Sequence, residues 1–352
     1  LSKKNKVDLI YTEPKENFHK KIRFINKTIF VKTHKIEKYF NILYYLIMGK
    51  PLQVGYFFSS EMKSKINEIK KDYNIIIFHL IRSGEFLPIN YEGTKILEMT
   101  DLISKNYLQL QKKLSFINPL KYIYLIEKIL LEKYEKKIIE PFNRIVLVSK
   151  EDVKYFSISN KLKRKIKIVS NGTDSKKKLY KFKKQNKDII FIGNINYLPN
   201  KIACYDFIKT IMPELKMKQI NINFKIIGQT DKLLKFYLTR FKNVEVYNNV
   251  KSPEKLCRNA ICGISNLSVV TGIQNKIMEY MRIGLPTIIS EKCFNNLNFI
   301  KNKDLLVYGN KDEFVKQIIK LKTEKTLAKK ISDNCYKKIK NYYTWEKSLK
   351  KY

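Results

Sequence analysis

The feature that most constrains this chain is a regular alternation, in which short runs rich in β-branched residues are separated by longer amphipathic stretches. This alternation is typical of βα units on parallel sheets. In the first half, the candidate strands are Val7–Ile10, Thr28–Thr33, Ile75–Phe78, Lys95–Glu98, Arg144–Val148 and Ile166–Val169. In the second half, they are Asp188–Ile192, Ile222–Ile227, Val244–Tyr247, Ile261–Ile264, Pro286–Ile289 and Leu305–Tyr308. The pattern predicts an α/β protein with two Rossmann-like, doubly wound parallel sheets.

The length of 352 residues is too great for one small core and fits two domains of ordinary size. A Lys-rich segment without apolar periodicity, residues 173–187, is predicted to link them. We expect an N-terminal domain over 1–172, a C-terminal domain over 188–338 and a terminal helix over 339–352. Because the first residues resemble the end of a helix that runs into a strand, we expect an earlier strand and helix, and a targeting signal stays open.

The cysteines and histidines bear on metal binding and on the redox compartment. All five cysteines lie in the second half without a Cys-x-x-Cys pair, which favours reduced thiols over a disulfide frame or a zinc site. The three histidines, His19, His34 and His79, are too scattered for a histidine-rich metal centre. The longest apolar run, around Phe40–Met48, is about half of what a membrane-spanning helix needs. We therefore expect no metal site, and no apolar run long enough to span a membrane.

The formal net charge of +39 allows three interpretations. Lysines dispersed over every solvated face fit a general codon bias, since Ile, Asn and Tyr are abundant too and Arg is scarce. A basic patch facing an anionic membrane would also raise the charge, and so would nucleic-acid binding. Within the basic region from Lys105 to Phe142, the stretch Ile117–Ile139 mixes Lys with Leu, Ile and Tyr. That mixture fits a helix lying on an acidic membrane or an ordinary surface helix.

Ligands of open parallel sheets bind beyond the carboxyl ends of the strands, where helices begin. In the first half, the polar side chains at these places are those of His79, Arg82, Asp101, Ser104 and Ser149. In the second half, the corresponding residues are Gly193-Asn194, Gly228-Gln229 and the segment Thr271–Lys276. Two sheets with such edges predict a ligand between the two domains.

The most informative segment runs from Val270 to Pro286. Gly272 permits a tight turn, and residues 274–276 open a helix whose apolar stripe is formed by Ile277, Met278 and Met281. Gly284 can end this helix. The segment therefore predicts a short helix that starts at the carboxyl edge of the second sheet.

Two charged residues of this helix, Lys276 and Glu279, are three positions apart and share a face. A helix start with a lysine fits a diphosphate, and a carboxylate one turn further can accept hydrogen bonds from ribose hydroxyls. The same spacing fits a surface helix with an intrahelical ion pair. In the second half, Gly193 ends the first strand, where a missing side chain would let a phosphate or sugar approach the backbone.

Two stretches resemble a known family: Ile-Gly-Asn-Ile-Asn-Tyr-Leu-Pro-Asn from Ile192, and Gly-Ile-Gln-Asn-Lys-Ile-Met-Glu-Tyr-Met from Gly272. They are similar to the family 4 retaining glycosyltransferases, in particular the bacterial branch of polysaccharide and cell-envelope biosynthesis. Shorter matches extend the resemblance over essentially the whole chain: Pro51–Phe57, His79–Arg82, Thr100-Asp101 with Ser104, Val148-Ser149, Val169–Gly172 and Thr344–Glu346.

The resemblance implies the GT-B fold, in which two Rossmann-like domains face a cleft, the first domain binds the acceptor and the second binds a nucleotide-sugar. It implies catalytic roles for His79, Lys276 and Glu279. It implies donor binding by Gly193, Asn194, Gly228, Thr271, Gly272, Ile273, Gln274 and Asn275, and acceptor-side roles for Arg82, Asp101 and Ser104. Glu279 matches the second glutamate of the family's Glu-x7-Glu motif, but the first falls on Thr271, which leaves the identity of the sugar open.

The resemblance also implies the reaction and its setting. We expect retaining, metal-independent transfer with no cofactor beyond the nucleotide-sugar co-substrate, and a saccharide or lipid-linked acceptor in surface polysaccharide synthesis. We expect a cytoplasmic protein, with an anionic membrane surface as a further partner at the inner face, a terminal helix that crosses back to the first domain, and no nucleic acid. Two alternatives stay open: a GT-B nucleotide-sugar 2-epimerase and a basic nucleic-acid-binding protein.

Overall fold

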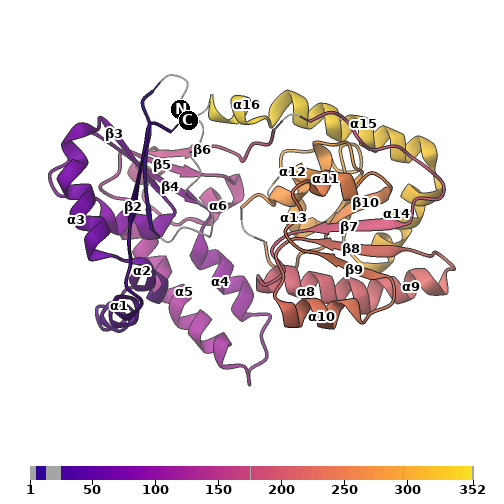
Figure 1. The fold of residues 1–352 in the computed structure, drawn as a ribbon, viewed down its shortest axis with the longest axis horizontal. Helices are drawn as coiled ribbons and strands as arrows, with labels where there is room; N and C mark the ends of the chain where they lie inside the picture. Colours follow the sequence, from indigo (N-terminus) through magenta and orange to yellow (C-terminus); the bar gives the residue numbers. More distant parts are fainter. Residues whose placement is uncertain (1–4, 13–24, 175, 271, 296, 351–352) are drawn as a thin grey trace. The chain divides into compact units, whose positions relative to one another are not determined.

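The computed structural model of the protein describes residues 5–12, 25–174, 176–270, 272–295 and 297–350 (Figure 1). By the contacts among its residues, the chain divides into two compact units. The first contains the described residues up to Val146 and the segment Ile158–Ile166, and the second contains Leu147–Ser157 and the described residues from Lys167 onward. This division differs from the predicted boundary at 172, because Leu147–Ser157 belongs with the second unit. One buried contact accounts for part of the difference: the backbone N–H of Gly272 donates to Asp152 Oδ2 over 3.2 Å.

The first unit holds strands and helices in the alternation that the sequence predicts. Its elements are β1 (Asp8–Thr12), β2 (Lys27–Val31), α1 (Lys35–Ile47), α2 (Leu52–Phe57), α3 (Ser60–Ile69), η1 (Lys70–Asp72), β3 (Ile75–His79), η2 (Ile81–Phe86), β4 (Thr94–Thr100), α4 (Ile103–Gln111), α5 (Pro119–Ile138) and α7 (Asn160–Lys163). The division between the units falls at the end of β5 (Arg144–Leu147) and inside β6 (Ile166–Ile168).

The strands of the first half form two sheets where the sequence predicts one. A four-stranded sheet has the order β3-β4-β5-β6, while β1 and β2 pair in parallel as a separate two-stranded sheet. A side chain connects β1 to the segment before β3, since the Tyr73 hydroxyl donates to Asp8 Oδ2 over 2.8 Å. The prediction of parallel βα units is therefore confirmed, and the prediction of a single sheet in this half is wrong for the described residues.

The second unit contains a six-stranded, fully parallel sheet in the order β12-β11-β10-β7-β8-β9. Its elements are α6 (Lys150–Tyr155), β7 (Asp188–Ile192), α8 (Leu198–Asp206), η3 (Phe207–Ile211), α9 (Met212–Met217), β8 (Asn223–Ile227), α10 (Lys232–Thr239), β9 (Val244–Tyr247), α11 (Pro253–Leu256), β10 (Ala260–Ser265), α12 (Asn275–Met281), β11 (Thr287–Ser290), α13 (Glu291–Phe294), β12 (Leu306–Tyr308), α14 (Lys311–Thr323), α15 (Lys325–Tyr342) and α16 (Trp345–Leu349). All six strands predicted for this half are present, within two residues at each end.

Both faces of this sheet are covered by apolar layers. Phe191 packs in one cluster with Phe207 and Phe224, and in Figure 1 α8 and α10 lie along one face while α12 and α15 lie along the other. The neighbouring residue Ile190 packs in a second cluster with Tyr280. Successive side chains of a strand point to opposite faces, so a strand buried on both faces is apolar throughout, as β7 and β10 are.

The segment predicted as a linker, 173–187, packs on the second unit where it is described. Tyr180 is buried, and the backbone N–H groups of Leu179 and Tyr180 both donate to the carbonyl of Ile283. The C-terminal part of the chain returns to the start of this segment, where Thr344 forms a bridge with Thr173. The expected crossing of the terminal helix to the first domain stays a prediction.

Two further expectations concern the cysteines and membrane-spanning helices. All five cysteines are buried, and each has a free thiol. Within the described ranges, no helix combines the length and the apolar character that crossing a bilayer requires.

Candidate functional site

The strand order of the second unit distinguishes one position along the carboxyl edge of its sheet. From β7 the chain proceeds to β8 and β9 on one side, and then returns to place β10, β11 and β12 on the other side. The direction of winding thus changes between β7 and β10. In doubly wound sheets, ligands bind beyond the carboxyl ends of the strands at such a switch point. The described residues that follow these two strands, 193–196, 266–270 and 272–274, therefore mark the candidate site.

Tyr280 fixes α12 across the switch point. Its hydroxyl accepts from the Ile192 backbone N–H of β7 over 2.7 Å and donates to the Ile264 carbonyl of β10 over 3.2 Å. Its ring lies over Gly263, where a Cβ atom would come within 2.4 Å of the ring. The predicted stripe of Ile277, Met278 and Met281 is buried with it. Sequence reasoning missed Tyr280, although a glycine inside an apolar strand signals a close approach of this kind.

Lys276 lies at the start of α12 with its ammonium group inside the protein. The residue is 7% exposed, its Nζ donates to Asn200 Oδ1 over 2.7 Å, and Nζ stands 3.9 Å from the centre of the Phe191 ring. Burial lowers the pKa of Lys276 to about 8. These two contacts of the ammonium are with an amide and an aromatic ring, and a buried positive charge in such surroundings gives a bound anion a large interaction energy.

Asn200, on α8, connects this lysine to the loop after β7. While its Oδ1 accepts from Lys276, its Nδ2 donates to the carbonyl of Asn194 over 2.8 Å. The side chain fits because Gly193 has none: a Cβ at Gly193 would lie 3.0 Å from Asn200 Nδ2. Asn200 ends the motif quoted from Ile192, but sequence reasoning did not assign it a role.

The two strand-end glycines, Gly193 and Gly228, serve packing. Gly228 has φ +145°, and a Cβ there would lie 2.0 Å from the carbonyl oxygen of Gly193. The sequence interpretation, in which the missing Gly193 side chain admits a phosphate, needs correction, because the Asn200 side chain occupies that space. Asn194 is exposed, and its Oδ1 accepts from the backbone N–H of Asn196.

Glu279 belongs to a small charged group on the outer side of α12. Its Oε2 lies 2.6 Å from Arg282 Nη2, and 36% of its side chain is exposed. Arg282 also lies 3.9 Å from Glu254 Oε2. The intrahelical ion pair therefore forms between Glu279 and Arg282, while Lys276 turns to Asn200. The Glu279 carboxylate is held in place and still reaches solvent.

The turn before α12 is fastened by side chains from earlier in the chain. Gly272 has φ +60° and donates its N–H to Asp152, so this amide is already occupied. Asn275 Oδ1 accepts from Asn171 Nδ2 over 2.7 Å. Ile273 packs against the core, and Gln274 is the N-cap residue of α12. Thr271, predicted to bind the donor, lies outside the described residues.

Three of the predicted residues of the first unit lie near the ends of β3 and β4. His79 ends β3, and its Nδ1 lies 3.0 Å from Glu98 Oε2. Arg82 places its guanidinium 3.9 Å from the centre of the Phe57 ring, and burial lowers the pKa of the arginine. Asp101 follows β4 directly, with its backbone N–H donating to the Met99 carbonyl.

Ser104 is a residue of the protein interior. It is 1% exposed, and its hydroxyl and its backbone N–H both donate to the carboxylate of Glu135 on α5. Burial is the main cause that raises the pKa of Glu135 to about 7. The expected acceptor-side role of Ser104 therefore needs correction, because a side chain enclosed with Glu135 cannot touch a saccharide. Its contact holds the first turn of α4 against α5.

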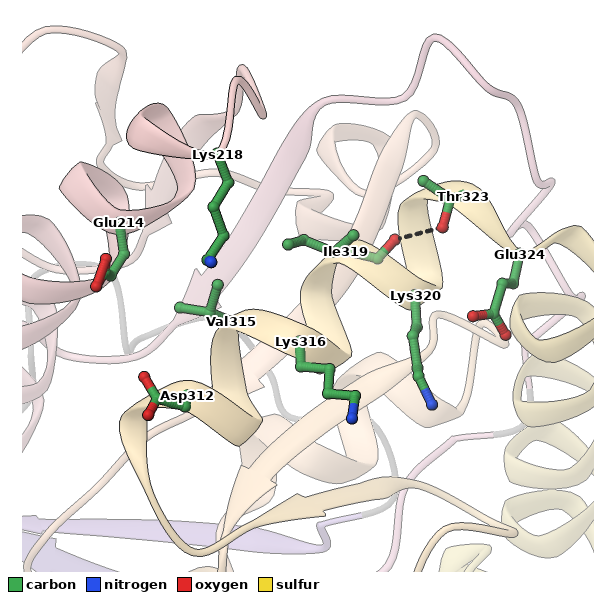
Figure 2. A pocket seen from close by; sticks show the side chains of 9 residues that line it. All are labelled: Glu214, Lys218, Asp312, Val315, Lys316, Ile319, Lys320, Thr323 and Glu324. Carbon is green, nitrogen blue, oxygen red and sulfur yellow. Dashed lines mark hydrogen bonds between the residues drawn. The ribbon is translucent and has the colours of Figure 1, made fainter.

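A hollow lies elsewhere on the second unit, between the end of α9 and the exposed side of α14. Its lining residues are Glu214, Lys218, Asp312, Val315, Lys316, Ile319, Lys320, Thr323 and Glu324. Figure 2 shows lysine and carboxylate side chains spread around it. Within the described residues no group of three side chains could hold a metal ion. The hollow contains none of the predicted site residues, so it takes no part in the candidate site.

The comparisons with known proteins agree with this architecture. Residues 186–324 match the family described as Glycosyl transferases group 1. This stretch contains β7 to β12 and the Lys276, Asn200 and Glu279 side chains just described. No curated protein sequence matches the chain.

Solved structures resemble the whole chain at low sequence identity. Sucrose-phosphate synthase from Thermosynechococcus elongatus is 14% identical with a TM-score of 0.68, covering 98% of this chain and 86% of its own. HepE from Anabaena, in complex with UDP-glucose, is 9% identical with a TM-score of 0.64, covering 94% and 84%.

A mutant of S. aureus TarM, in complex with fondaparinux, alpha-GlcNAc-glycerol and UDP, is 15% identical with a TM-score of 0.59. It covers 83% of this chain, which spans 57% of the length of TarM. The chain has the α/β fold of these proteins, the GT-B fold built from two Rossmann-like domains. The match of residues 186–324 falls entirely within the second unit of this fold.

Proposed function

We propose that the protein is a retaining glycosyltransferase of the family 4 type, which moves a sugar from a nucleotide-sugar to a saccharide or lipid-linked saccharide in surface polysaccharide synthesis. The observation that carries the proposal is the buried ammonium of Lys276, held by Asn200 at the switch point of the segment that matches glycosyl transferases group 1. The structures of HepE and TarM named above hold UDP-glucose and UDP, which supports a nucleoside diphosphate as the donor's leaving group.

In the proposed donor complex, Lys276 stabilises the diphosphate. Because α12 has only seven residues, the full charge of the lysine contributes more than the helix dipole does. A preorganised charge of this kind, acting where negative charge develops on the leaving group, is worth about 3–4 kcal/mol of transition-state stabilisation. Glu279, held by Arg282, accepts hydrogen bonds from the ribose hydroxyls. Gln274 and Asn275, at the start of the helix, complete the donor side.

The proposed chemistry retains the configuration of the sugar. The acceptor hydroxyl forms a bond to the anomeric carbon on the face from which the diphosphate leaves, and the bond from that carbon to the phosphate oxygen breaks. The hydroxyl proton passes to the departing phosphate oxygen. The protein then contributes alignment and charge stabilisation. We propose that neither a metal ion nor a cofactor takes part, and that the nucleotide-sugar is a co-substrate.

The acceptor side of the proposal concerns the first unit. We assign His79, which the contact with Glu98 orients, to the reaction centre, and Arg82 and Asp101 to the acceptor. A lipid-linked acceptor would require the enzyme to work at the inner face of a membrane, so we propose a cytoplasmic protein that binds an anionic membrane surface peripherally. The two alternatives, an epimerase and a nucleic-acid-binding protein, are not favoured by the family match.

A panel of nucleotide-sugars tests the proposal through thermal unfolding. A donor present at about 100 times its Kd stabilises the folded state by about 2.7 kcal/mol. We expect one or a few nucleotide-sugars to raise the Tm, and the free nucleoside diphosphate to do so as well, because it carries the groups that contact Lys276 and Glu279. With that donor and an acceptor, NMR of the product should show the anomeric configuration of the donor. If no nucleotide-sugar changes the Tm, or if the product is inverted, the proposal is wrong.

A further inference from the structure

In helix α1 of the first unit, the polar face packs against the protein and the apolar face is exposed, which is the reverse of the usual arrangement. The face that contacts the rest of the unit is polar: Glu37 Oε1 accepts from the backbone N–H and hydroxyl of Ser60, and Asn41 Nδ2 donates to the Phe58 carbonyl. Tyr45 is buried, and its hydroxyl donates to Glu85. Lys38 is buried on the same face. Polar side chains therefore fix the helix to the protein.

The opposite face of α1 is apolar and exposed. Ile36, Tyr39, Phe40, Leu43, Tyr44 and Ile47 recur at the spacing of a single helical stripe, and Leu46 and Met48 extend it at the C-terminal end. The exposed fractions of these eight side chains range from 44% to 75%. The only acidic residue of the helix, Glu37, is held by Ser60. A surface helix of a globular protein normally buries such a stripe.

The main chain of α1 is held close to its neighbour, so the helix has a fixed orientation. A Cβ at Gly55 of α2 would lie 2.6 Å from the carbonyl oxygen of Asn41. In turn, the start of α2 is held by α5, because the buried Glu127 accepts from the backbone N–H groups of Leu52 and Gln53. The apolar stripe is therefore presented by a rigid support rather than by a loose segment.

The charges around the stripe indicate its partner. Lys32 and Lys35 are exposed at the start of the helix, and the chain as a whole carries a net charge of +39. That charge repels a second copy of the chain and attracts an anionic surface. Tyrosines and lysines beside an apolar stripe are typical of helices that lie in the boundary between headgroups and acyl chains. At 13 residues α1 is about 20 Å long, which is too short to span a bilayer and sufficient to lie along one.

We propose that α1 is the element with which the protein docks on an anionic lipid bilayer, its axis parallel to the surface and its apolar stripe among the acyl chains. The inference deepens the proposed function and rests on it, since a lipid-linked acceptor would be presented at that surface. In the sequence, residues 117–139 fit either a helix lying on an acidic membrane or an ordinary surface helix. In that region α5 exposes a second apolar set next to lysines, and Figure 1 shows α1 and the start of α5 both toward the lower edge of the first unit. The α5 set consists of Leu120, Tyr122, Ile123, Leu125, Ile126 and Ile129.

Flotation of the full chain with vesicles tests the docking surface. The vesicles contain phosphatidylcholine alone or with about one quarter phosphatidylglycerol. The test variant is Phe40→Ser with Ile47→Ser, which are 69% and 75% exposed. The matched control is Leu233→Ser with Phe236→Ser on α10, which are 79% and 63% exposed. We expect the wild type and the control to bind phosphatidylglycerol vesicles equally, and the α1 variant to bind at least about tenfold more weakly.

A second measurement shows insertion directly. Because Trp345 also emits, the variant is Tyr39→Trp with Trp345→Phe, and its emission should shift to shorter wavelength when phosphatidylglycerol vesicles are added, since the indole at position 39 enters the acyl boundary. Equal vesicle binding by the α1 variant and the control, or equal binding to both vesicle types, would overturn the proposal. So would a wild type that forms dimers, does not bind vesicles and becomes monomeric in the α1 variant, because the stripe would then join two copies.

The change in Tm caused by a nucleotide-sugar is measured on the same variants. We expect it to be unchanged in the α1 variant. A chain that responds to the donor but not to vesicles contradicts the docking surface alone. A chain that binds vesicles through α1 but responds to no donor contradicts the proposed enzyme and leaves the surface in place.

Discussion

Replacing Asn200 by alanine tests whether this side chain keeps Lys276 charged. In the native protein Asn200 Oδ1 accepts from the Lys276 ammonium over 2.7 Å, and burial has already lowered the pKa of the lysine to about 8. A hydrogen bond to a charged group contributes about 1.5–3 kcal/mol, and about 1.4 kcal/mol corresponds to one pKa unit. Without this bond the pKa of Lys276 should fall to about 6–7.

The consequence is a change in the pH dependence of UDP binding. At about pH 7.5 roughly three quarters of the native lysine is charged, but only about 3–25% in Asn200→Ala, so UDP should bind roughly 3- to 25-fold more weakly. Near about pH 5.5 the two proteins should bind UDP with nearly equal affinity, since both lysines are then charged. Calorimetric titration with UDP over this pH range measures the effect.

A matched control is Asn266→Ala. Asn266 follows β10 within the candidate site, is also buried and donates to a carbonyl of α8, that of Ala203, whereas the Lys276 ammonium donates to Asn200. We expect this variant to lose stability and keep the native pH dependence of UDP binding. If Asn200→Ala binds UDP with the native pH profile, the argument that Asn200 sustains the charge of Lys276 is refuted.

Three further predictions concern the same unit. Glu279→Gln should weaken UDP binding by about 1–2 kcal/mol, measured by calorimetry. The control is Glu254→Gln, which removes the other carboxylate beside Arg282 and should leave UDP binding unchanged. Equal losses in both variants would mean that Glu279 acts only through the arginine. Gly228→Ala should lower the free energy of unfolding by at least about 3 kcal/mol in urea denaturation, because its Cβ would meet the Gly193 carbonyl. The control is Gly49→Ala, at a residue with positive φ but open space around it, which should lower the free energy of unfolding by only about 1–2 kcal/mol. Similar losses in both variants would contradict the clash. The folded state holds Lys276 at a pKa of about 8, below its unfolded value of 10.5, so the unfolded state binds more protons between these pH values. Stability relative to Lys276→Met should therefore rise by about 3 kcal/mol from about pH 8 to 10.5, and a flat difference between the two unfolding curves would show that the lysine is not buried as described.

The strands and the edge of the second sheet could be predicted from the sequence because they depend on local pattern. Apolar runs such as Ile189–Phe191 and the turn residue Gly228 mark where strands end, and parallel sheets bind ligands at those ends. The short helix that carries Lys276 and Glu279 could be predicted in the same way, but their spacing did not indicate that Lys276 turns inward to Asn200 while Glu279 pairs with Arg282. The separate pairing of β1 with β2 could not be predicted, since the pattern of a strand does not identify its neighbour.

The contacts that shape the site depend on residues far apart in the chain. Asn200 reaches Lys276 across 76 positions, and Tyr280 reaches Ile192 across 88. No local signal indicates that Gly228 makes room for the backbone of Gly193, or that Gly193 makes room for the side chain of Asn200. Ser104 looked like a residue at a strand end, but its surroundings are set by Glu135 from another helix.

Helix α1 shows that the sequence pattern also does not indicate which face of a helix is exposed. In the sequence, the run Phe40–Met48 stands out only as an apolar run too short to cross a membrane. Periodicity predicts that an amphipathic helix buries its apolar face, and in α1 the polar contacts of Asn41 and Tyr45 reverse that expectation. Which face a helix buries is decided by its neighbours, here α2 and α3.

The central claim is that a nucleoside diphosphate binds against the Lys276 ammonium. The number of protons taken up on binding tests this contact most directly. At about pH 8.5 roughly three quarters of the lysine is neutral in the free protein, and a bound diphosphate should restore its charge. Calorimetric titration with UDP in two buffers of different ionisation enthalpy should therefore show uptake of roughly 0.7 proton by the wild type, and none with weaker binding by Lys276→Met. UDP that binds both proteins with the same affinity and the same proton count would contradict the account.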